Sequence, residues 1–269
     1  MNQIEQKLAT TPRNYRYLLT ISLIIVGLII WLLTSIQVNG LESNGWTIAK
    51  SILTGIFKPN LALLFALNQQ GIAYLLLETI AIAFLGTLIG GMLAIPLAFL
   101  SASNIVTKPV AYLTRLLLIV IRTVPALVYG LMFIRVTGPG PFAGVLTIGL
   151  TSIGMLAKLY VDAIENLDIS IFESMSSIGC NTFEKIRFGI VPQLFSIFLS
   201  IIIYRFDINL RDAAVLGLVA AGGIGAPLKF AMDSYRWNEV GSILIGLVIL
   251  ILLVEWFSTK LRRKLVTGR

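Results

Sequence analysis

Long apolar runs separated by short polar segments dominate the amino-acid sequence. A helix of roughly 20 apolar residues crosses the hydrocarbon core of a bilayer. Five runs reach or approach this length, and they cover residues 18–38, 72–101, 112–133, 142–164 and 240–257. A sixth, shorter run over residues 190–204 leads into a charged stretch and then a glycine-rich one. The pattern predicts an all-α integral membrane protein with about six transmembrane helices, of which the fifth is irregular.

The N-terminal part of the chain is more mixed than the rest. The run over residues 18–38 has no charge and is longer than the apolar core of a cleaved signal peptide, which has roughly 7–15 residues, so we expect a retained helix. Residues 39–70 predict an external loop with one or two interfacial helices, Trp46 lying at headgroup level. We therefore expect residues 1–70 to hold a cytoplasmic tail, the first helix and this loop, and residues 71–269 to form the membrane core.

Glycine and proline mark further features of the core. Gly86 and Gly90 form a GxxxG pair, which favours a close contact between two helices in a membrane. Arg122 and Pro125 lie inside the third run, which we expect to be a single span. Residues 137–141 read Thr-Gly-Pro-Gly-Pro, and they predict a loop because proline removes a backbone donor and clashes with a continuing helix.

Composition and charge support a membrane protein. Hydrophobic residues make up 57% of the chain and charged residues 13%, whereas a soluble domain is about half apolar and a quarter charged. The net charge of +8 would otherwise suggest nucleic acid as a partner. Here the basic residues cluster in both terminal segments and in the turn over residues 102–115, as in cytoplasmic segments. We expect a multi-pass protein in a lipid bilayer, with both termini cytoplasmic and no nucleic-acid partner.

The residue types that most enzymes need are scarce. The chain has no histidine and a single cysteine, Cys180, which excludes Ser-His-Asp and Cys-His catalysis, most zinc sites and an intrachain disulfide. No G-x-x-x-x-G-K-[ST] phosphate loop occurs. We expect neither an enzyme nor a metal site, and if ATP drives the protein, another chain must hydrolyse it.

The segment between the fourth and fifth runs, residues 165–190, is polar and is interrupted by Gly179. Met175 and Ile178 fall at helical spacing on one face, and apolar positions recur beyond the glycine, beginning at Phe183. The pattern predicts two short amphipathic helices joined by a turn. They either lie on the membrane surface or dock into a groove on a cytoplasmic partner.

This segment resembles a motif of a known family. Glu173, Gly179 and Pro192 fall in register with the EAA loop of bacterial ABC importer permeases, written EAA-x3-G-x9-I-x-LP. Ser174 and Met175 stand where that motif has two alanines. In that family the loop forms a coupling helix that binds the ATPase subunit. The resemblance implies a coupling role for Glu173, Ser174, Gly179, Phe183, Lys185 and Pro192.

A charged stretch and a glycine-rich stretch follow the fifth run. On a helix, Arg205, Asn209 and Asp212 share one face, while Asp207 and Arg211 form an i,i+4 pair on another. Charges at this depth are costly unless they pair or line a wet cavity. The apolar stretch that comes next is too short to cross and ends in Gly-Gly-Ile-Gly, which predicts a half-helix or re-entrant segment. The whole stretch forms either a substrate path or gate, or a structural rim with packing glycines.

The same stretch, YRFDINLRDAAVLGLVAAGGIG over residues 204–225, resembles the signature of the phosphonate ABC-transporter permease family. Asp207 stands for the family's usual glutamate and Ala220 for a usual glycine. The resemblance implies the type I ABC importer (MetI-like) fold with a cytoplasmic coupling helix, import of a phosphonate, phosphite or related oxyanion, and a place in the bacterial inner membrane. It also implies three partners: a second copy of the chain, a cytoplasmic ATPase dimer that binds ATP and Mg, and a periplasmic binding protein.

The charge pattern and the resemblance together suggest which residues form the substrate path or gate. Arginine offers charge-assisted hydrogen bonds to a tetrahedral anion, and Arg122 either points into the cavity or pairs with Glu78. The candidate residues are Arg122, Arg205, Asp207, Asn209, Arg211, Gly222, Gly223 and Gly225. Two other functions stay open, an ABC permease for another small solute such as an amino acid and an ion-coupled secondary transporter.

Overall fold

A computed structural model describes residues 15–35, 45–64 and 71–267, which are helical apart from short turns. The chain separates into two compact units, residues 1–50 and 51–269. In chain order the helices are α2 (Tyr15–Ser35), α3 (Gly45–Ile56), α4 (Leu61–Leu64), α5 (Ile72–Ser101), α6 (Lys108–Thr123), α7 (Ala126–Thr137), α8 (Pro141–Glu165), α9 (Ile169–Ser177), α10 (Thr182–Glu184), the π-helix η1 (Lys185–Ile190), α11 (Val191–Gly217), α12 (Gly225–Asp233) and α13 (Trp237–Thr267).

The number of membrane spans agrees with the hydropathy pattern. Among the described residues, five helices are long and apolar enough to cross a bilayer: α2, α5, α8, the helix running through α10, η1 and α11, and α13. The bent pair α6 and α7 makes a sixth when it is counted as one span. The predicted all-α membrane fold with about six transmembrane helices is therefore confirmed, and α5 has the bounds that its apolar run predicts.

The first unit contains α2, whose apolar side chains are almost all exposed along its 21 residues. Such a helix needs hydrocarbon around it. Residues 36–38 of the predicted first span lie outside the described residues. The short helices α3 and α4 agree with the prediction of one or two helices in residues 39–70, and Trp46 in α3 is exposed.

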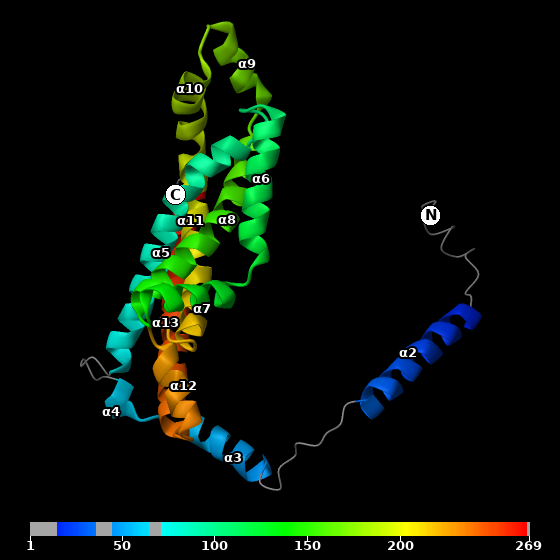
Figure 1. Cartoon of the computed structure of the whole chain (residues 1–269), viewed down its shortest axis with the longest axis vertical. Coiled ribbons are helices and arrows are strands. Elements are labelled where there is room, and N and C mark those ends of the chain that lie inside the picture. The colour runs from blue at the N-terminus through cyan, green and yellow to red at the C-terminus, as the bar shows by residue number, and fades with distance from the viewer. Residues whose placement is uncertain (1–14, 36–44, 65–70, 268–269) are drawn as a thin grey trace. The chain divides into compact units, whose positions relative to one another are not determined.

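In the second unit α5, α8, α11 and α13 form an elongated bundle, with α6 against α5 and α8 (Figure 1). Two glycines, which carry no side chain, let α5 approach α8 closely. A Cβ atom added to Gly86 would lie 2.7 Å from Cβ of Ile148, and one added to Gly90 would lie 2.6 Å from Cβ of Ser152. The close helix contact that the GxxxG pair predicts is thus present, with α8 as the partner.

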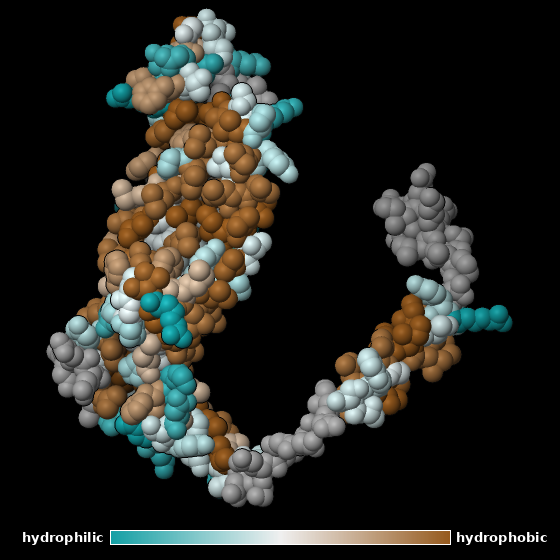
Figure 2. Space-filling view, in the orientation of Figure 1, coloured by the Kyte–Doolittle hydropathy of each residue, from teal (hydrophilic) through white to brown (hydrophobic). Residues whose placement is uncertain are grey.

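The surface of this bundle is apolar where a membrane would surround it. Figure 2 shows hydrophobic side chains over its middle and hydrophilic ones toward its two ends, near α9 and α10 and near α12. Leu113, Met92 and Leu252 are among the large apolar side chains that are exposed there. Burying these side chains in lipid removes the same surface from water as a protein core would.

The third span, which the sequence predicts over residues 112–133, is broken into two helices. It consists of α6 and α7, which meet at an angle of 84°. Val124 has extended backbone angles, and Pro125 follows it at the start of α7. The ring of a proline disfavours helical angles at the preceding residue, so the helix ends there and restarts in a new direction.

The fifth span also differs from the prediction, which ended it near Tyr204 and placed the charged stretch outside. One helical span instead runs from Thr182 to Gly217, and Arg205 and Asn209 lie within it. Of the apolar stretch after the charges, residues 213–217 therefore belong to this helix and residues 218–221 to the turn that follows it, so the stretch is not a half-helix. The polar side chains can stay in the span because residues of α5 and α8 pair with them.

Candidate functional site

A buried polar cluster joins three helices in the middle of the bundle. The side-chain amide of Asn209 on α11 donates to Oγ1 of Thr87 on α5 at 2.7 Å and to Oγ of Ser152 on α8 at 2.8 Å. All three side chains are buried. The two bonds satisfy the NH2 group of the amide and fix the positions of the three helices relative to one another, whereas the buried amide oxygen of Asn209 has no partner among the described residues.

Arg205 lies one turn before Asn209 and has weak partners for a buried guanidinium. Its Nε donates to Ser152 Oγ at 3.3 Å, and one terminal nitrogen donates to the thioether of Met155 at 3.0 Å. The other terminal nitrogen is 3.7 Å from a carboxylate oxygen of Asp212, beyond hydrogen-bond distance. Arg205 is 7% exposed, and a thioether is only a weak acceptor. Its donors are therefore ready for a stronger acceptor.

The predicted helical faces of this stretch are confirmed. Arg205 and Asp212 face each other, and Asp207 pairs with Arg211 at 3.3 Å. Arg211 also contacts Glu255 of α13 at 3.3 Å, which links α11 to α13. One carboxylate oxygen of Asp207 is buried without a hydrogen-bond donor among the described residues. A buried acceptor left in this state costs about 1–3 kcal/mol.

The glycine turn after α11 is held from α5. Oε1 of Glu78 accepts a hydrogen bond from the backbone N–H of Gly223 at 2.9 Å, and Oγ1 of Thr79 accepts one from Ile224 at 3.0 Å. These contacts overturn the alternative in which Glu78 pairs with Arg122. The carboxylate instead satisfies the backbone N–H of Gly223, a donor outside the helix.

The glycines of this turn have packing reasons of their own. Gly222 and Gly223 have φ values of +85° and +73°, which L side chains rarely adopt. A Cβ atom on Gly222 would lie 2.6 Å from Cα of Pro141, and one on Gly225 would lie 2.2 Å from the carbonyl oxygen of Ala214. The structure thus supports the packing interpretation for these glycines, and their role in a gate stays a prediction.

Arg122 lies on a different face of the bundle from Arg205. Its side chain packs on Gly154, where an added Cβ atom would be 2.5 Å from Cγ of the arginine. Together with Lys158 and Asp162 it lines a groove of about 310 Å³ between α6 and α8. Arg115 and Glu165 form an ion pair in the same groove. The structure therefore does not bring Arg122 together with the Arg205 cluster.

The segment between α8 and α11 forms the predicted helix–turn–helix. Asp168 caps α9 by accepting a hydrogen bond from the backbone N–H of Ser170 at 3.0 Å, and this bond lowers the pKa of the Asp168 carboxyl. Gly179 turns the chain with a φ of +83°. Asn181 and Glu184 then form a reciprocal capping box at the start of α10.

The predicted coupling residues lie on or next to this helix–turn–helix. Glu173, Ser174 and Phe183 are exposed, Phe183 to 68%, although it is apolar. Lys185 braces the two arms by donating to Ser176 Oγ at 2.8 Å. Pro192 opens α11 directly after the π-helix. An exposed apolar side chain at the tip of a braced hairpin is typical of a docking element.

Several partners of the charged stretch were missed by sequence reasoning. They are Thr87, Ser152, Met155 and Glu255. Hydroxyls in an apolar helix often bond to their own backbone, as Thr87 also does with the carbonyl of Ala83. The one available signal was position, because Thr87 follows Gly86 in the GxxxG stretch that packs against α8.

Comparison with known proteins gives sequence relatives along most of the chain. Residues 94–266 match the family described as binding-protein-dependent transport system inner membrane component. The phosphite transport system permease protein PtxC of Stutzerimonas stutzeri is 34% identical over 189 residues, 70% of this chain and 69% of that protein. The phosphate-import permease protein PhnE of Mycolicibacterium smegmatis is 36% identical over 196 residues, 72% of this chain but 37% of that protein.

Solved structures with the same fold are more distant in sequence. The inward-facing MetNI methionine ABC transporter has a chain that superposes with a TM-score of 0.62 at 18% identity, covering 71% of this chain and 94% of that one. An amino acid ABC transporter gives 0.58 at 22% identity, covering 69% and 88%. These likenesses show the MetI-like fold, and the match over residues 94–266 gives the family: the chain is a binding-protein-dependent transport system inner membrane component.

Proposed function

We propose that the chain is the membrane-spanning subunit of an ATP-driven importer that moves a phosphonate- or phosphite-type oxyanion inward. Two relatives are named for phosphite and phosphate transport, which supports a tetrahedral phosphorus oxyanion as the cargo. In this chain, the weak pairing of the buried Arg205 guanidinium favours such a cargo. It donates to the Met155 thioether and, at 3.3 Å, to Ser152 Oγ, and the Asp212 carboxylate is 3.7 Å away, beyond hydrogen-bond distance.

The chemistry of Arg205 suits brief contact with an oxyanion. A phosphorus oxyanion presents charged oxygens to the guanidinium fork, and these are far stronger acceptors than the sulfur of Met155. Asp212 lies near Arg205 and Asp207 pairs with Arg211, so the two carboxylates partly offset the positive potential of the arginines. The anion therefore gains attraction in the span without the tight binding that would prevent its release.

The family supports an assembly with several partner subunits. The sequence contains no phosphate loop, so we assign ATP and Mg to a cytoplasmic ATPase dimer. A periplasmic binding protein delivers the cargo, and a second copy of the chain completes the pore in the bacterial inner membrane, with both termini cytoplasmic. The hairpin of α9, α10 and η1 couples to the ATPase through the residues around Glu173 and Phe183.

The test is uptake by the reconstituted complex with its ATPase and binding protein. Arg205→Gln is expected to lower import of the oxyanion at least tenfold, because a hydrogen bond to a charged group is worth about 1.5–3 kcal/mol. Arg205→Lys keeps the charge but loses the fork and should fall in between. The matched control is Arg135→Gln, which removes an exposed arginine at the end of α7 and should leave import unchanged.

Basal ATP hydrolysis and assembly of the complex serve as the readouts of folding. They should be preserved in Arg205→Gln, since Asp212, the carboxylate that loses its charged neighbour, is 39% exposed and stays solvated. Import within twofold of the wild type would overturn the role of Arg205. A binding protein that holds an amino acid and ignores methylphosphonate, phosphite and phosphate would overturn the cargo.

A further inference from the structure

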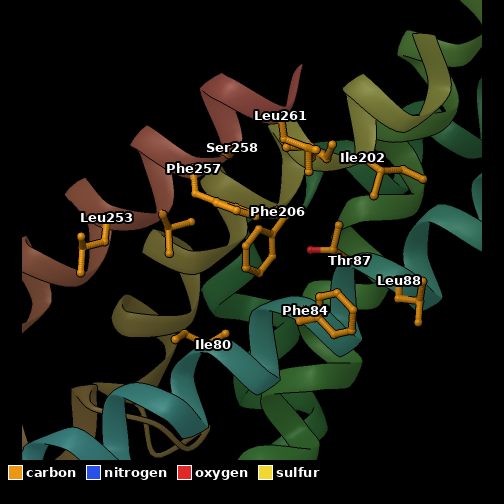
Figure 3. Close-up of a pocket in the computed structure, with 12 residues that line it drawn as sticks. Ile80, Phe84, Thr87, Leu88, Ile202, Phe206, Leu253, Phe257, Ser258 and Leu261 are labelled. Atoms are coloured by element: carbon orange, nitrogen blue, oxygen red, sulfur yellow. The ribbon is translucent and has the colours of Figure 1, made fainter. Parts of the chain in front are cut away.

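An apolar groove runs along the bundle where α5, α11 and α13 meet (Figure 3). Its volume is about 400 Å³, and its lining contains one hydroxyl from Thr87 and one from Ser258 among otherwise apolar side chains. Phe84, Phe206 and Phe257 are its aromatic members, and Leu253 and Leu261 are among the residues that line it from α13. In Figure 3 the rings of Phe84 and Phe206 stand on one side of the groove and the α13 side chains on the other.

The groove reaches the polar cluster through Thr87. This side chain lines the groove, and its oxygen also accepts the hydrogen bond from Asn209 at 2.7 Å. Whatever fills the groove therefore covers one side of the contact between α5 and α11. An apolar occupant would keep water from competing for that hydrogen bond, since interactions of this kind strengthen in a low dielectric.

One end of the groove carries positive charge. Leu261 is the last lining residue of α13, and it lies among Lys260, Arg262 and Lys264 on the final turns of that helix. The Lys260 ammonium is 5.3 Å from the ring centroid of Trp256, and the Arg262 guanidinium is 5.6 Å from that of Tyr204. Aromatic and basic side chains gather in this way at the level of lipid headgroups.

We infer that the groove binds an acyl chain of an anionic phospholipid, whose headgroup lies against Lys260, Arg262 and Lys264. Leu253 and Leu261 are separated by eight residues of helix, or about 12 Å, so the apolar part is long and leads to the cationic end. An amphiphile with one negative end matches both features. A second copy of the chain would need space for a helix, which is about 10–12 Å across with its side chains, whereas this groove is a slot between three helices.

The experiment measures lipid retention by the full chain in its importer complex, purified in detergent with equal amounts of phosphatidylglycerol and phosphatidylcholine. Native mass spectrometry counts the bound lipids. Wild type is expected to retain phosphatidylglycerol at least fivefold over phosphatidylcholine. Leu253→Trp fills the groove and should reduce that retention at least fivefold. Leu252→Trp is the matched control on the neighbouring face of α13, since Leu252 is 61% exposed and outside the lining.

A second pair of variants tests the charged end. Substituting Lys260, Arg262 and Lys264 by glutamine should remove the preference for phosphatidylglycerol, whereas Lys108→Gln, at the start of α6, should not. Equal retention of both lipids by the wild type, or unchanged retention in Leu253→Trp, would overturn the inference. Loss of the second copy in Leu253→Trp with lipid content unchanged would assign the groove to that copy instead. None of these readouts depends on the proposed cargo.

Discussion

Removing a single hydroxyl from α5 tests how the glycine turn is held. Thr79 is 1% exposed, and its oxygen accepts the backbone N–H of Ile224 at 3.0 Å while its own hydrogen goes to the carbonyl of Leu75 at 2.7 Å. Thr79→Val keeps the shape of the side chain and removes the acceptor. The N–H of Ile224, which is fully buried, then has no partner among the described residues.

The magnitude follows from that buried donor. Leaving a buried backbone N–H unsatisfied costs about 1–3 kcal/mol. The neighbouring bond from Gly223 to Glu78 stays in place, so the loss is confined to one donor. For a unit of this size, about 1 kcal/mol shifts the melting temperature by roughly 2–4 °C. Taking a loss of about 2 kcal/mol, we expect Thr79→Val to lower the melting temperature by about 4–8 °C.

The assay is thermal unfolding of the purified full chain, combined with hydrogen exchange at the amide of Ile224. Thr147→Val is the matched control, because Thr147 is equally buried but its hydroxyl donates to the carbonyl of Ala143 in its own helix. The control should change the melting temperature by less than half as much. If Thr79→Val has the same melting temperature as the control, and the Ile224 amide exchanges no faster than in the wild type, Thr79 does not hold the turn.

Two further predictions concern the backbone. Ala220 has a φ of +67°, a conformation that costs a non-glycine residue about 1–2 kcal/mol. Glycine removes this cost but adds entropy to the unfolded chain, so Ala220→Gly should raise the melting temperature by only a few degrees. A lower melting temperature would contradict this. The Asp168 cap of α9 should show a pH dependence: because its pKa is lowered in the folded state, its contribution is present above the ordinary aspartate pKa and is lost as the pH falls through the lowered value. The protection factors of the α9 amides, which correct for the intrinsic slowing of exchange in acid, should therefore fall at acid pH in the wild type but not in Asp168→Asn, and identical acid profiles would refute the role of the cap.

Hydropathy predicted the spans well because lipid imposes a simple requirement on each of them. A segment that crosses must satisfy its backbone internally and present apolar side chains, and both properties are local in sequence. The bounds of α5 and the close approach at Gly86 and Gly90 follow from such local features. The 84° bend at Pro125 was beyond this reasoning, because the direction in which a chain restarts after a proline depends on what α7 packs against.

The site was only half predictable for a related reason. Periodicity placed Arg205, Asn209 and Asp212 on one helical face, and the structure has them there. Their partners Thr87 and Ser152 are 122 and 57 residues from Asn209 in sequence, and no local pattern marks a hydroxyl as a partner for an amide elsewhere. Hydropathy therefore ended the fifth span at its first charge, whereas distant partners let the helix continue.

The continuity of that helix bears on how force reaches the cluster under the proposed function. Thr182 to Gly217 is one continuous helix of 36 residues that begins in the hairpin, so movement of the hairpin is passed along its axis to Asn209. The contacts of Asn209 with Thr87 and Ser152 are short and buried, and they are either made or broken, which favours two discrete arrangements over a gradual slide. The π-helix at its start, η1, has wider hydrogen-bonded turns that allow some change of register before the regular helix begins. Because Arg211 also contacts Glu255, a shift of α11 that breaks the cluster must also carry α13 with it or give up that ion pair.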